Sequence, residues 1–477
     1  MSFRSANAVE AKVIQLVFGL ACVMLGLVAV RSMMSGSRSM AGLIAGGVIQ
    51  LAVTIALDAR YWLMSPILMT GVLRVPGVPF DGFEMACLSV TAVHFIRLAI
   101  HRDQTARINR DILPALPLLC WMGLVFFLNP TGMSMLGSSS VGGRFYFKIA
   151  IGFTAMLALS TQRVDETGAR WLFWGLLLSF TIRLVRGVLS PGADPDAVVY
   201  AGAAPEVSAR YAFITAASIY TLVFARKSLT DLLRSFGLIV LMGILALLTI
   251  YSGKRSAFAR LALIPVFRTI LVGRERLLTF VMMVLALMVM VFAIAGDGTL
   301  YQLPNSAKRA LAVLNTKYAN RSGDGGAQDD FRATMREFAR EEIRRDPLFG
   351  RKGFAMDFNE AVWVNMQKGP FAGHVMAGAW HSALYAYPAD FGLPCLFFFL
   401  IFAWHVIRYT LRAPRIVVAG NYLPVICLYC SFELLFMFVF LYTSGHASMT
   451  TMELMLRYGL LMAVVRGYQE QQGQLQA

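Results

Sequence analysis

A few cationic and imidazole side chains suggest what chemistry this chain could do. Lys254 and Arg255 stand between two apolar segments, in the stretch TIYSGKRSAFARLALI. Guanidinium groups hold phosphate oxygens through paired hydrogen bonds, so an arginine at a membrane surface indicates an anion there. His381 begins HSALYAYPADFGLP, which leads into another apolar segment. A histidine in that place is either a simple interfacial residue or a base that titrates near neutral pH, and spacing does not separate the two.

A second group of cations lies on an amphipathic helix that we predict from Asp329 to Arg345. Asp329 or Asp330 would cap its start, and Pro347 would follow its end. Its arginines recur every four residues, at Arg332, Arg336, Arg340 and Arg344. We expect the last three to form a solvated face.

The composition indicates the setting in which these residues act. The chain has 477 residues, of which 57% are hydrophobic and only 15% are charged. A soluble protein could not cover that much apolar surface, so we predict an all-α polytopic membrane protein. A membrane-spanning helix needs roughly 20 apolar residues, and by that measure the chain has about 12–14 of them. The formal charge of +16 then indicates basic cytoplasmic loops and contact with anionic lipid or phosphate, not with nucleic acid.

The apolar segments divide the chain into four parts. We predict segments at 13–30, 39–57, 61–73, 82–100, 112–128, 145–160, 171–189, 209–225, 235–250, 256–271, 277–295, 391–408, 420–442 and 451–466. The parts are N-terminal helices (1–234), helices with an outer arginine motif (235–295), a large polar loop module with short helices (296–390) and C-terminal helices (391–477). All six cysteines fall in apolar segments, so a disulfide framework is not expected.

Loop charges predict the orientation of the chain. Four basic stretches connect alternate segments and belong in the cytoplasm, at 101–111, 225–234, 267–276 and 408–415. The acidic loop 190–207 suits the outside, which puts both termini in the cytoplasm and 296–390 outside. Parity then places Lys254 and Arg255 on the outer side, against the charge rule. They either meet an anion there or snorkel to lipid headgroups.

Several of these residues together resemble the O-antigen ligase and polysaccharide polymerase family. The resemblance consists of an S-x-x-R at the outer end of a span, an arginine in a long external loop, a P-L-x-G-x-G-F-like turn, and a histidine motif that enters the next span. The matching residues are Ser252, Arg255, Arg332, the turn PLFGRKGF (347–354), His381, Ser382, Leu384 and Gly392. The chain departs from the family in one extra turn residue, in Ser382 where asparagine is usual, and in FGLP, which lacks a second glycine.

The resemblance implies a GT-C type glycosyltransferase at the periplasmic face of a bacterial inner membrane. It would transfer a glycan from undecaprenyl pyrophosphate to a sugar hydroxyl with inversion, without a metal or cofactor. The acceptor would be lipid A-core in a ligase or another lipid-linked glycan in a polymerase. We lean towards the polymerase because the motif is altered and the external loop is long. A flippase and a chain-length regulator are possible partners.

The resemblance also implies roles for individual residues. It makes His381 the base for the acceptor hydroxyl, with Arg332 and Arg255 on the pyrophosphate. Further candidates for donor binding are Lys254, Arg183, Arg186, Arg210, Ser382 and His374. For Arg183, Arg186 and Arg210, pairing with Asp194, Asp196 or Glu206 in the loop between their spans is an equally good interpretation.

Charges within the last two spans have a structural and a functional interpretation. Glu433, Glu453 and Arg457 lie inside apolar segments, and intramembrane charges often mark functional sites. We prefer a structural tie between the spans. His446, in the short outer loop TSGHASMT, is a weaker candidate for a second polar group at the site.

A transporter or flippase of lipid-linked oligosaccharide is the alternative function. Transporters tend to show internal repeats and polar groups near the middle of the membrane. This sequence shows no repeat, and its unusual charges gather at one face, which favours chemistry at an interface. Two acidic stretches, DPD (194–196) and DGGAQDD (324–330), are weak metal-site candidates.

Overall fold

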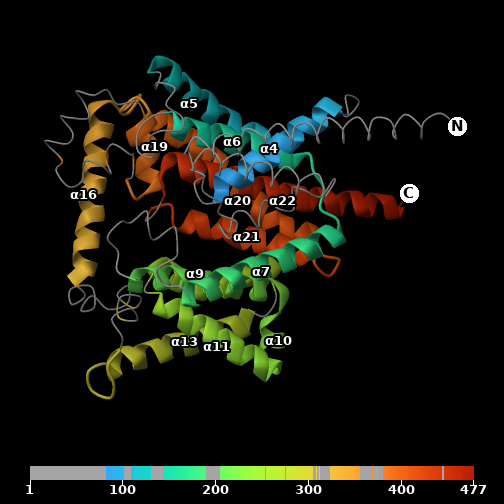
Figure 1. The fold of residues 1–477 in the computed structure, drawn as a ribbon, viewed down its shortest axis with the longest axis vertical. Coiled ribbons are helices and arrows are strands. Elements are labelled where there is room, and N and C mark those ends of the chain that lie inside the picture. Colours follow the sequence, from blue (N-terminus) through green and yellow to red (C-terminus); the bar gives the residue numbers. More distant parts are fainter. Residues whose placement is uncertain are drawn as a thin grey trace, which may run out of the picture. The chain divides into compact units, whose positions relative to one another are not determined.

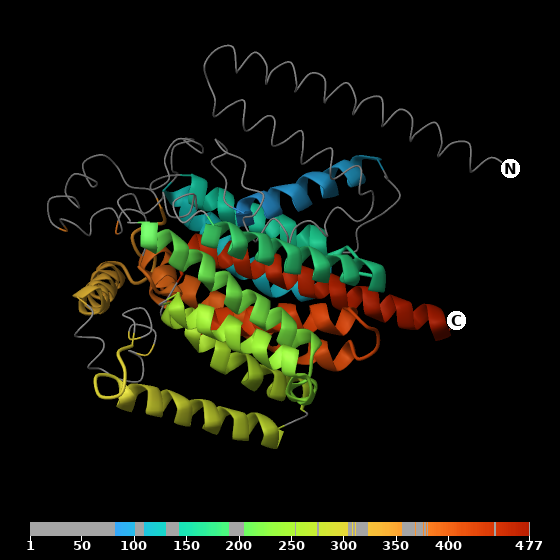
Figure 2. The same cartoon turned by 60° about the horizontal axis from the view of Figure 1, so that its bottom comes forward.

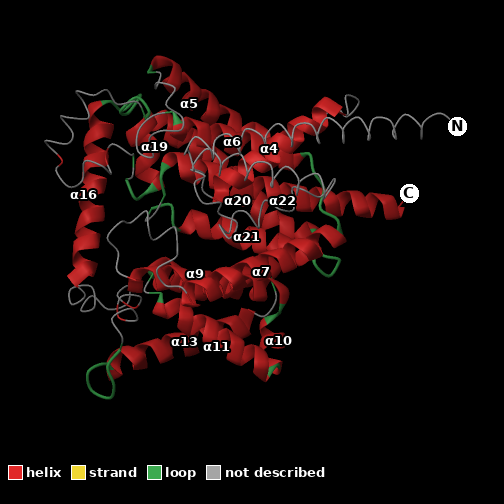
Figure 3. Ribbon diagram, viewed as in Figure 1, coloured by secondary structure: helices red, strands yellow, loops and turns green. Residues whose placement is uncertain are grey.

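The computed structural model describes residues 82–100, 109–129, 143–189, 205–252, 254–273, 276–303, 308, 311, 323–354, 368, 375, 378, 380–442 and 445–476. These residues are mostly helical and include no strand, as Figure 3 shows, which agrees with the all-α prediction. The predicted segments 13–30, 39–57 and 61–73 lie outside the described residues.

The helices follow the predicted apolar segments closely. In chain order they are α4 (Gly82–Ile100), η2 (Arg110–Ala115), α5 (Leu116–Leu128), α6 (Arg144–Ser160), α7 (Glu166–Leu189), α9 (Pro205–Arg226), α10 (Leu229–Arg234), α11 (Phe236–Tyr251), α12 (Arg255–Val272), α13 (Arg276–Gly296), α16 (Gly323–Arg345), α19 (Ala383–Phe391), α20 (Leu393–Ile416), α21 (Leu423–Val439) and α22 (Ala447–Gln476). Among the described residues, four helical stretches are long and apolar enough to cross a membrane, at Arg110–Leu128, Glu166–Val185, Arg276–Gly296 and Leu393–Ile416. The total number of spans stays a prediction.

The largest differences from the predicted helix boundaries occur in three helices. α16 starts at Gly323, so Asp329 and Asp330 lie inside the helix and the predicted cap at either residue is wrong. α20 and α22 continue past the predicted ends at 408 and 466, through stretches that are more polar than the preceding segments. Apolar length therefore predicts the apolar part of a helix, but it does not predict how far the helix continues into more polar sequence.

The chain divides into two compact units, at residues 1–104 and 105–477. In the first unit the structure describes α4, a single apolar helix on which Glu84 is fully buried. The second unit holds the other described helices, and the candidate site lies entirely within it.

In the second unit the helices alternate in direction along the chain. At one end, the N–H of Val164 before α7 donates to the carbonyl of Ala463 in the middle of α22, at 3.1 Å. At the other end, the N–H of Ala383 at the start of α19 donates to the carbonyl of Leu441 after α21, at 2.8 Å. We call the second end the module end, because α16 lies across it and packs against α19 (Figures 1 and 2). We call the first the basic end.

The most extensive helix pair is α6 with α22, and glycines allow its close approach. A β-carbon on Gly152 would lie 2.8 Å from the Cα of Met452, and one on Gly459 would lie 3.0 Å from the Cα of Met156. Small residues of this kind let helix backbones come together in membranes, where van der Waals packing drives association.

The basic end is held by polar contacts between distant parts of the chain. The carboxylate of Glu166 accepts the backbone N–H groups of Asn421, Tyr422 and Leu423, at 2.9, 2.6 and 3.2 Å, and so caps the start of α21. Exposed cations surround this end, at Arg110, Arg163, Arg170, Arg226, Lys227, Arg234, Arg276, Arg408, Arg412 and Arg415. The charge rule favours the cytoplasmic side of a membrane for such an end, and its orientation stays a prediction.

Candidate functional site

His381 lies at the module end, directly before α19. Its backbone has φ 54°, in the left-handed region that residues other than glycine rarely adopt. Both neighbours are buried, since Trp380 and Ser382 are each 0% exposed. The backbone of His381 therefore has an unusual conformation, and the residues on either side of it are buried.

A second histidine lies beside it. The ring centroid of His381 is 6.1 Å from that of His446 and 5.3 Å from that of Phe331 on α16. His446 sits in the connection between α21 and α22, next to Gly445, whose φ is 105°. A side chain on Gly445 would meet the hydroxyl of Thr450 at 2.4 Å, so the turn that carries His446 is tightly packed. The weaker sequence candidate thus lies next to the stronger one.

Arginines of α16 face tyrosines at the same end. Arg336 lies over the ring of Tyr442, 5.2 Å from its centroid. Arg340 lies 5.6 Å from the ring centroid of Tyr385 and donates a hydrogen bond of 3.3 Å to its hydroxyl. Arg340 and Arg344 are exposed, as the predicted solvated face requires, whereas Arg336 is half-buried. The contacts that Arg336 and Arg340 make with tyrosines were not predicted. The four-residue spacing predicted that these arginines share one face of the helix, but it did not predict that this face packs against tyrosines.

Arg332 and Arg255 come from two different helices of the second unit. Arg332 is half-buried and follows Phe331, which contacts His381. Arg255 is half-buried and is the first residue of α12, while Lys254 before it is exposed. Ser252 is buried, and its hydroxyl donates to the carbonyl of Thr249 at 2.6 Å. The S-x-x-R motif therefore builds the turn from α11 to α12 and presents its arginine at a helix start.

The remaining predicted donor-binding residues are placed in part. Arg183 is half-buried near the end of α7. Arg186 and Arg210 lie on α7 and α9, and their side chains are outside the described part of the chain, as is His374. Ser382 is fully buried, with its hydroxyl 3.3 Å from the carbonyl oxygen of Leu441. That hydroxyl has a backbone partner, and its contact with a substrate stays a prediction.

The PLFGRKGF turn carries a buried ion pair that the sequence analysis missed. The Arg351 Nε lies 2.8 Å from the Asp390 Oδ1, with side chains only 5% and 0% exposed. The indole N–H of Trp380 donates to the same oxygen at 2.9 Å, and Arg351 Nη1 donates to the carbonyl of Val375 at 2.6 Å. We call Arg351, Trp380 and Asp390 the lock. Burial raises the pKa of Asp390 to about 6, although Arg351 and Trp380 both favour its charged form.

Backbone contacts fasten the same turn to the end of α19. The N–H groups of Arg351 and Gly353 donate to the carbonyls of Ala389 and Asp390, at 2.8 and 2.6 Å. Gly350, Lys352 and Gly353 all have positive φ, of 61°, 61° and 90°. The extra residue of this turn relative to the family pattern is thus absorbed by left-handed backbone, which glycine adopts without steric cost.

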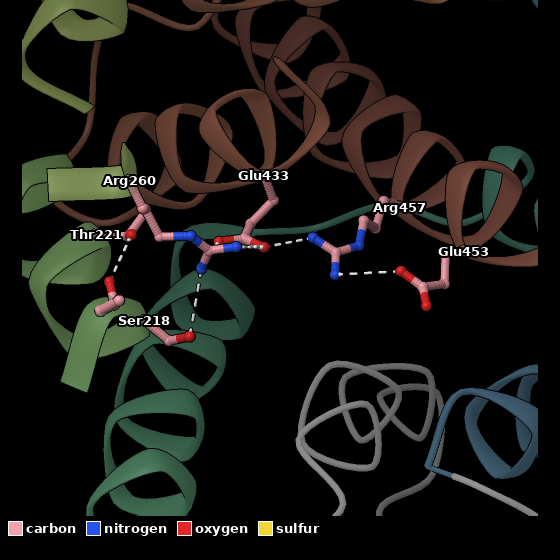
Figure 4. Close-up of polar contacts among 7 residues, drawn as sticks. Ser218, Thr221, Arg260, Glu433, Glu453 and Arg457 are labelled. Carbon is pink, nitrogen blue, oxygen red and sulfur yellow. Dashed lines mark hydrogen bonds and ion pairs between the residues drawn. The ribbon is translucent and has the colours of Figure 1, made fainter. Parts of the chain in front are cut away.

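Below the module end, a row of alternating charges joins three helices. Figure 4 shows Glu433 of α21 between Arg260 of α12 and Arg457 of α22, with Glu453 beyond Arg457. Arg260 Nη1 lies 2.9 Å from Glu433 Oε1 and 3.3 Å from the hydroxyl of Ser218. The expected tie between the last two spans is confirmed, and it includes Arg260, whose role the sequence did not show. Arg260 is the third cation of the stretch TIYSGKRSAFARLALI, after Lys254 and Arg255, and its charge is balanced by Glu433.

These observations define a site in which an imidazole pair, guanidinium groups and tyrosines share one end of an apolar bundle. Among the described residues, no three or more His, Cys, Asp or Glu side chains gather as a metal site would require. The sequence matches no model of a known protein family. A comparison with curated proteins likewise found no significant match.

Proposed function

We propose that this protein is a membrane glycosyltransferase that moves a glycan from undecaprenyl pyrophosphate to an acceptor sugar hydroxyl. The observation that carries the proposal is the module end itself. There, His381 and His446 lie together, and α16 brings Arg336 and Arg340 against two tyrosines beside them. A polyprenyl tail needs an apolar bundle, a pyrophosphate needs cations, and sugar rings pack well on aromatic faces.

The reaction needs a proton acceptor and a stabilised leaving group. The acceptor hydroxyl oxygen attacks the anomeric carbon, and its proton passes to the imidazole of His381. The bond between that carbon and the pyrophosphate oxygen breaks on the opposite face, so the configuration inverts. The electron pair stays on the undecaprenyl pyrophosphate, where negative charge grows as the bond breaks.

The arginines provide the second requirement. Arg255 at the start of α12 and Arg332 on α16 are the proposed pyrophosphate ligands, with Lys254 as an outer cation. Guanidinium forks aimed at the developing charge stabilise the transition state more than the ground state. Such forks supply positive charge directly, so the scheme uses no metal ion.

An in vitro transfer assay tests the proposal. Purified protein would receive an undecaprenyl-pyrophosphate oligosaccharide as the only glycan, with EDTA present, and products would be separated by size. We expect the wild type to build a ladder of longer glycans and His381→Ala to build none. Arg344→Ala is the matched control, because Arg344 is exposed on the same helix as the site arginines.

The other outcomes are informative too. If the wild type makes no ladder, lipid A-core is added as acceptor, and product formed only then identifies a ligase. No transfer with either acceptor, from protein that is folded and monodisperse, would refute the proposal. Movement of lipid-linked oligosaccharide across vesicles would then be measured, since a flippase is the alternative.

A further inference from the structure

We propose that the lock positions the imidazole of His381 for proton transfer. Arg351, Trp380 and Asp390 would then be positioning residues that act through His381 without touching substrate. The inference builds on the role proposed above for His381 as the base, but its structural part can be tested without any transfer assay.

The lock grips the chain immediately before His381. Asp390 accepts the indole N–H of Trp380, the residue that precedes His381, at 2.9 Å. Arg351 lies 5.7 Å from the ring centroid of Trp380, so the indole is held by a hydrogen bond at its edge and a cation near the ring. Trp380 is 0% exposed, which leaves the indole no alternative place.

Two described residues shortly before Trp380, Val375 and Gly378, lie against the ion pair. Arg351 Nη1 donates to the carbonyl of Val375 at 2.6 Å and fixes the start of this segment. Gly378, with φ 61°, sits so close that a β-carbon would lie 2.7 Å from Arg351 Nη2 and 3.0 Å from Asp390 Oδ2. Only a glycine leaves room for the segment to close over two buried charged groups.

The other side of His381 is anchored independently. Ala383 donates its N–H to the carbonyl of Leu441 at 2.8 Å, and the buried Ser382 hydroxyl lies 3.3 Å from the same oxygen. His381 therefore bridges two anchors, and its positive φ persists because both hold. If the lock opens, the backbone of His381 can relax to a common conformation, and the imidazole then leaves its place beside Phe331 and His446.

Chemical labelling tests this positioning directly. Diethyl pyrocarbonate acylates accessible neutral imidazoles, and mass spectrometry reads each histidine separately. The His381 Nε2 atom is buried, so slow labelling is expected in the wild type. In Trp380→Phe, which keeps an aromatic ring but loses the N–H, we expect His381 to label at least threefold faster. His405 on α20 is the internal reference, and its rate should not change.

A second lock variant and a control variant complete the labelling experiment. Asp390→Asn keeps an oxygen acceptor for the indole but removes the charge, so its effect on His381 should be smaller than that of Trp380→Phe. Trp404→Phe, at a tryptophan 62% exposed on α20, is the matched control and should leave His381 unchanged. Wild-type labelling of His381 in both lock variants, with both proteins folded, would overturn the proposal.

The transfer assay separates this inference from the proposed function. A positioning role predicts that Trp380→Phe lowers kcat about tenfold and leaves KM for the donor unchanged. A lock variant that changes His381 labelling but keeps full kcat would show that the position of His381 does not matter for transfer, and would overturn the inference. If the wild type transfers no glycan while the labelling shift occurs, the proposed function fails and the placement of His381 by the lock stands.

Discussion

The row of charges inside the bundle and the arginine face of α16 use the same side chain in opposite ways. Inside the bundle, Arg260 and Arg457 both contact the carboxylate of Glu433, and two positive charges meet two negative ones once Glu453 is counted. On α16, Arg336 and Arg340 lie against tyrosines, and within the described residues neither forms an ion pair.

The difference shows which cations serve the fold and which remain available to a ligand. Guanidinium groups that are paired with buried carboxylates have their charge balanced by the protein itself. A guanidinium group that lies over an aromatic ring has its N–H donors at the edge of its plane, where they can still bind a phosphate or a sugar hydroxyl. We therefore expect the first cluster to determine stability and the second to determine activity.

Removal of the central carboxylate should have the largest effect. Glu433→Ala leaves Arg260 and Arg457 without their shared partner, and an uncompensated buried charge costs about 3–5 kcal/mol. Thermal unfolding of the detergent-solubilised protein should show a large fall in Tm or loss of folded protein. The combined variant Arg260→Met, Glu433→Leu, Glu453→Leu and Arg457→Met should recover most of the loss, because an apolar replacement removes all four charges together. An unchanged Tm in Glu433→Ala would show that the buried charges do not determine stability.

Loss of the imidazole should have the converse effect. His381→Ala should lower the transfer rate by about 10²–10⁴-fold, the usual contribution of a general base, and leave Tm close to that of the wild type. Initial rates with purified protein and thermal unfolding of the same sample check both halves. A fall in Tm as large as that of Glu433→Ala would show that His381 belongs with the structural cluster.

The two stacked arginines should give a smaller and more selective effect. Arg336→Ala and Arg340→Ala should each lower transfer about tenfold and leave Tm close to that of the wild type, because cation–π pairs outside the core contribute little to folding. Arg344→Ala on the same helix is the control. Equal activity of all three variants would show that the tyrosine contacts of the first two have no functional consequence.

The smallest effect concerns pH and the lock. Burial raises the pKa of Asp390 to about 6, above an ordinary value of about 3.9. Between these values the folded protein holds a proton that the unfolded chain has lost, so this group favours folding at low pH and the benefit disappears as pH rises. From pH 5 to pH 7.5 the stability of the wild type should fall by about 1 kcal/mol relative to Asp390→Asn. Parallel Tm curves for the two proteins would contradict the assignment.

The sequence predicted the helices well and the contacts between them poorly. Apolar length and periodicity located most described helices within a few residues, because those signals are local. The tie between Glu433 and Arg457 followed from the rarity of charges in apolar segments. Arg260 was not included, because its partner depends on how α12 is rotated about its axis, which one sequence does not reveal.

The lock shows the same limit at the site. His381 stood out because of its place before a span, and the glycines of PLFGRKGF indicated a tight turn. Arg351 and Asp390 carried no local signal, since one looked like a loop cation and the other like an interfacial carboxylate. Their pairing arises only when the turn folds back on the end of α19.

The carboxylate that caps α21 also constrains how the chain is made. Glu166 serves backbone groups 255 to 257 residues further along. α7 is therefore synthesised long before the helix whose first turn it caps, and the carboxylate of Glu166 is already present when α21 is made. A C-terminal fragment that begins after α7 would have to leave those amides to solvent, so the last helices are not an autonomous assembly unit. The start of α21 can therefore form its capping hydrogen bonds only when α7 is present.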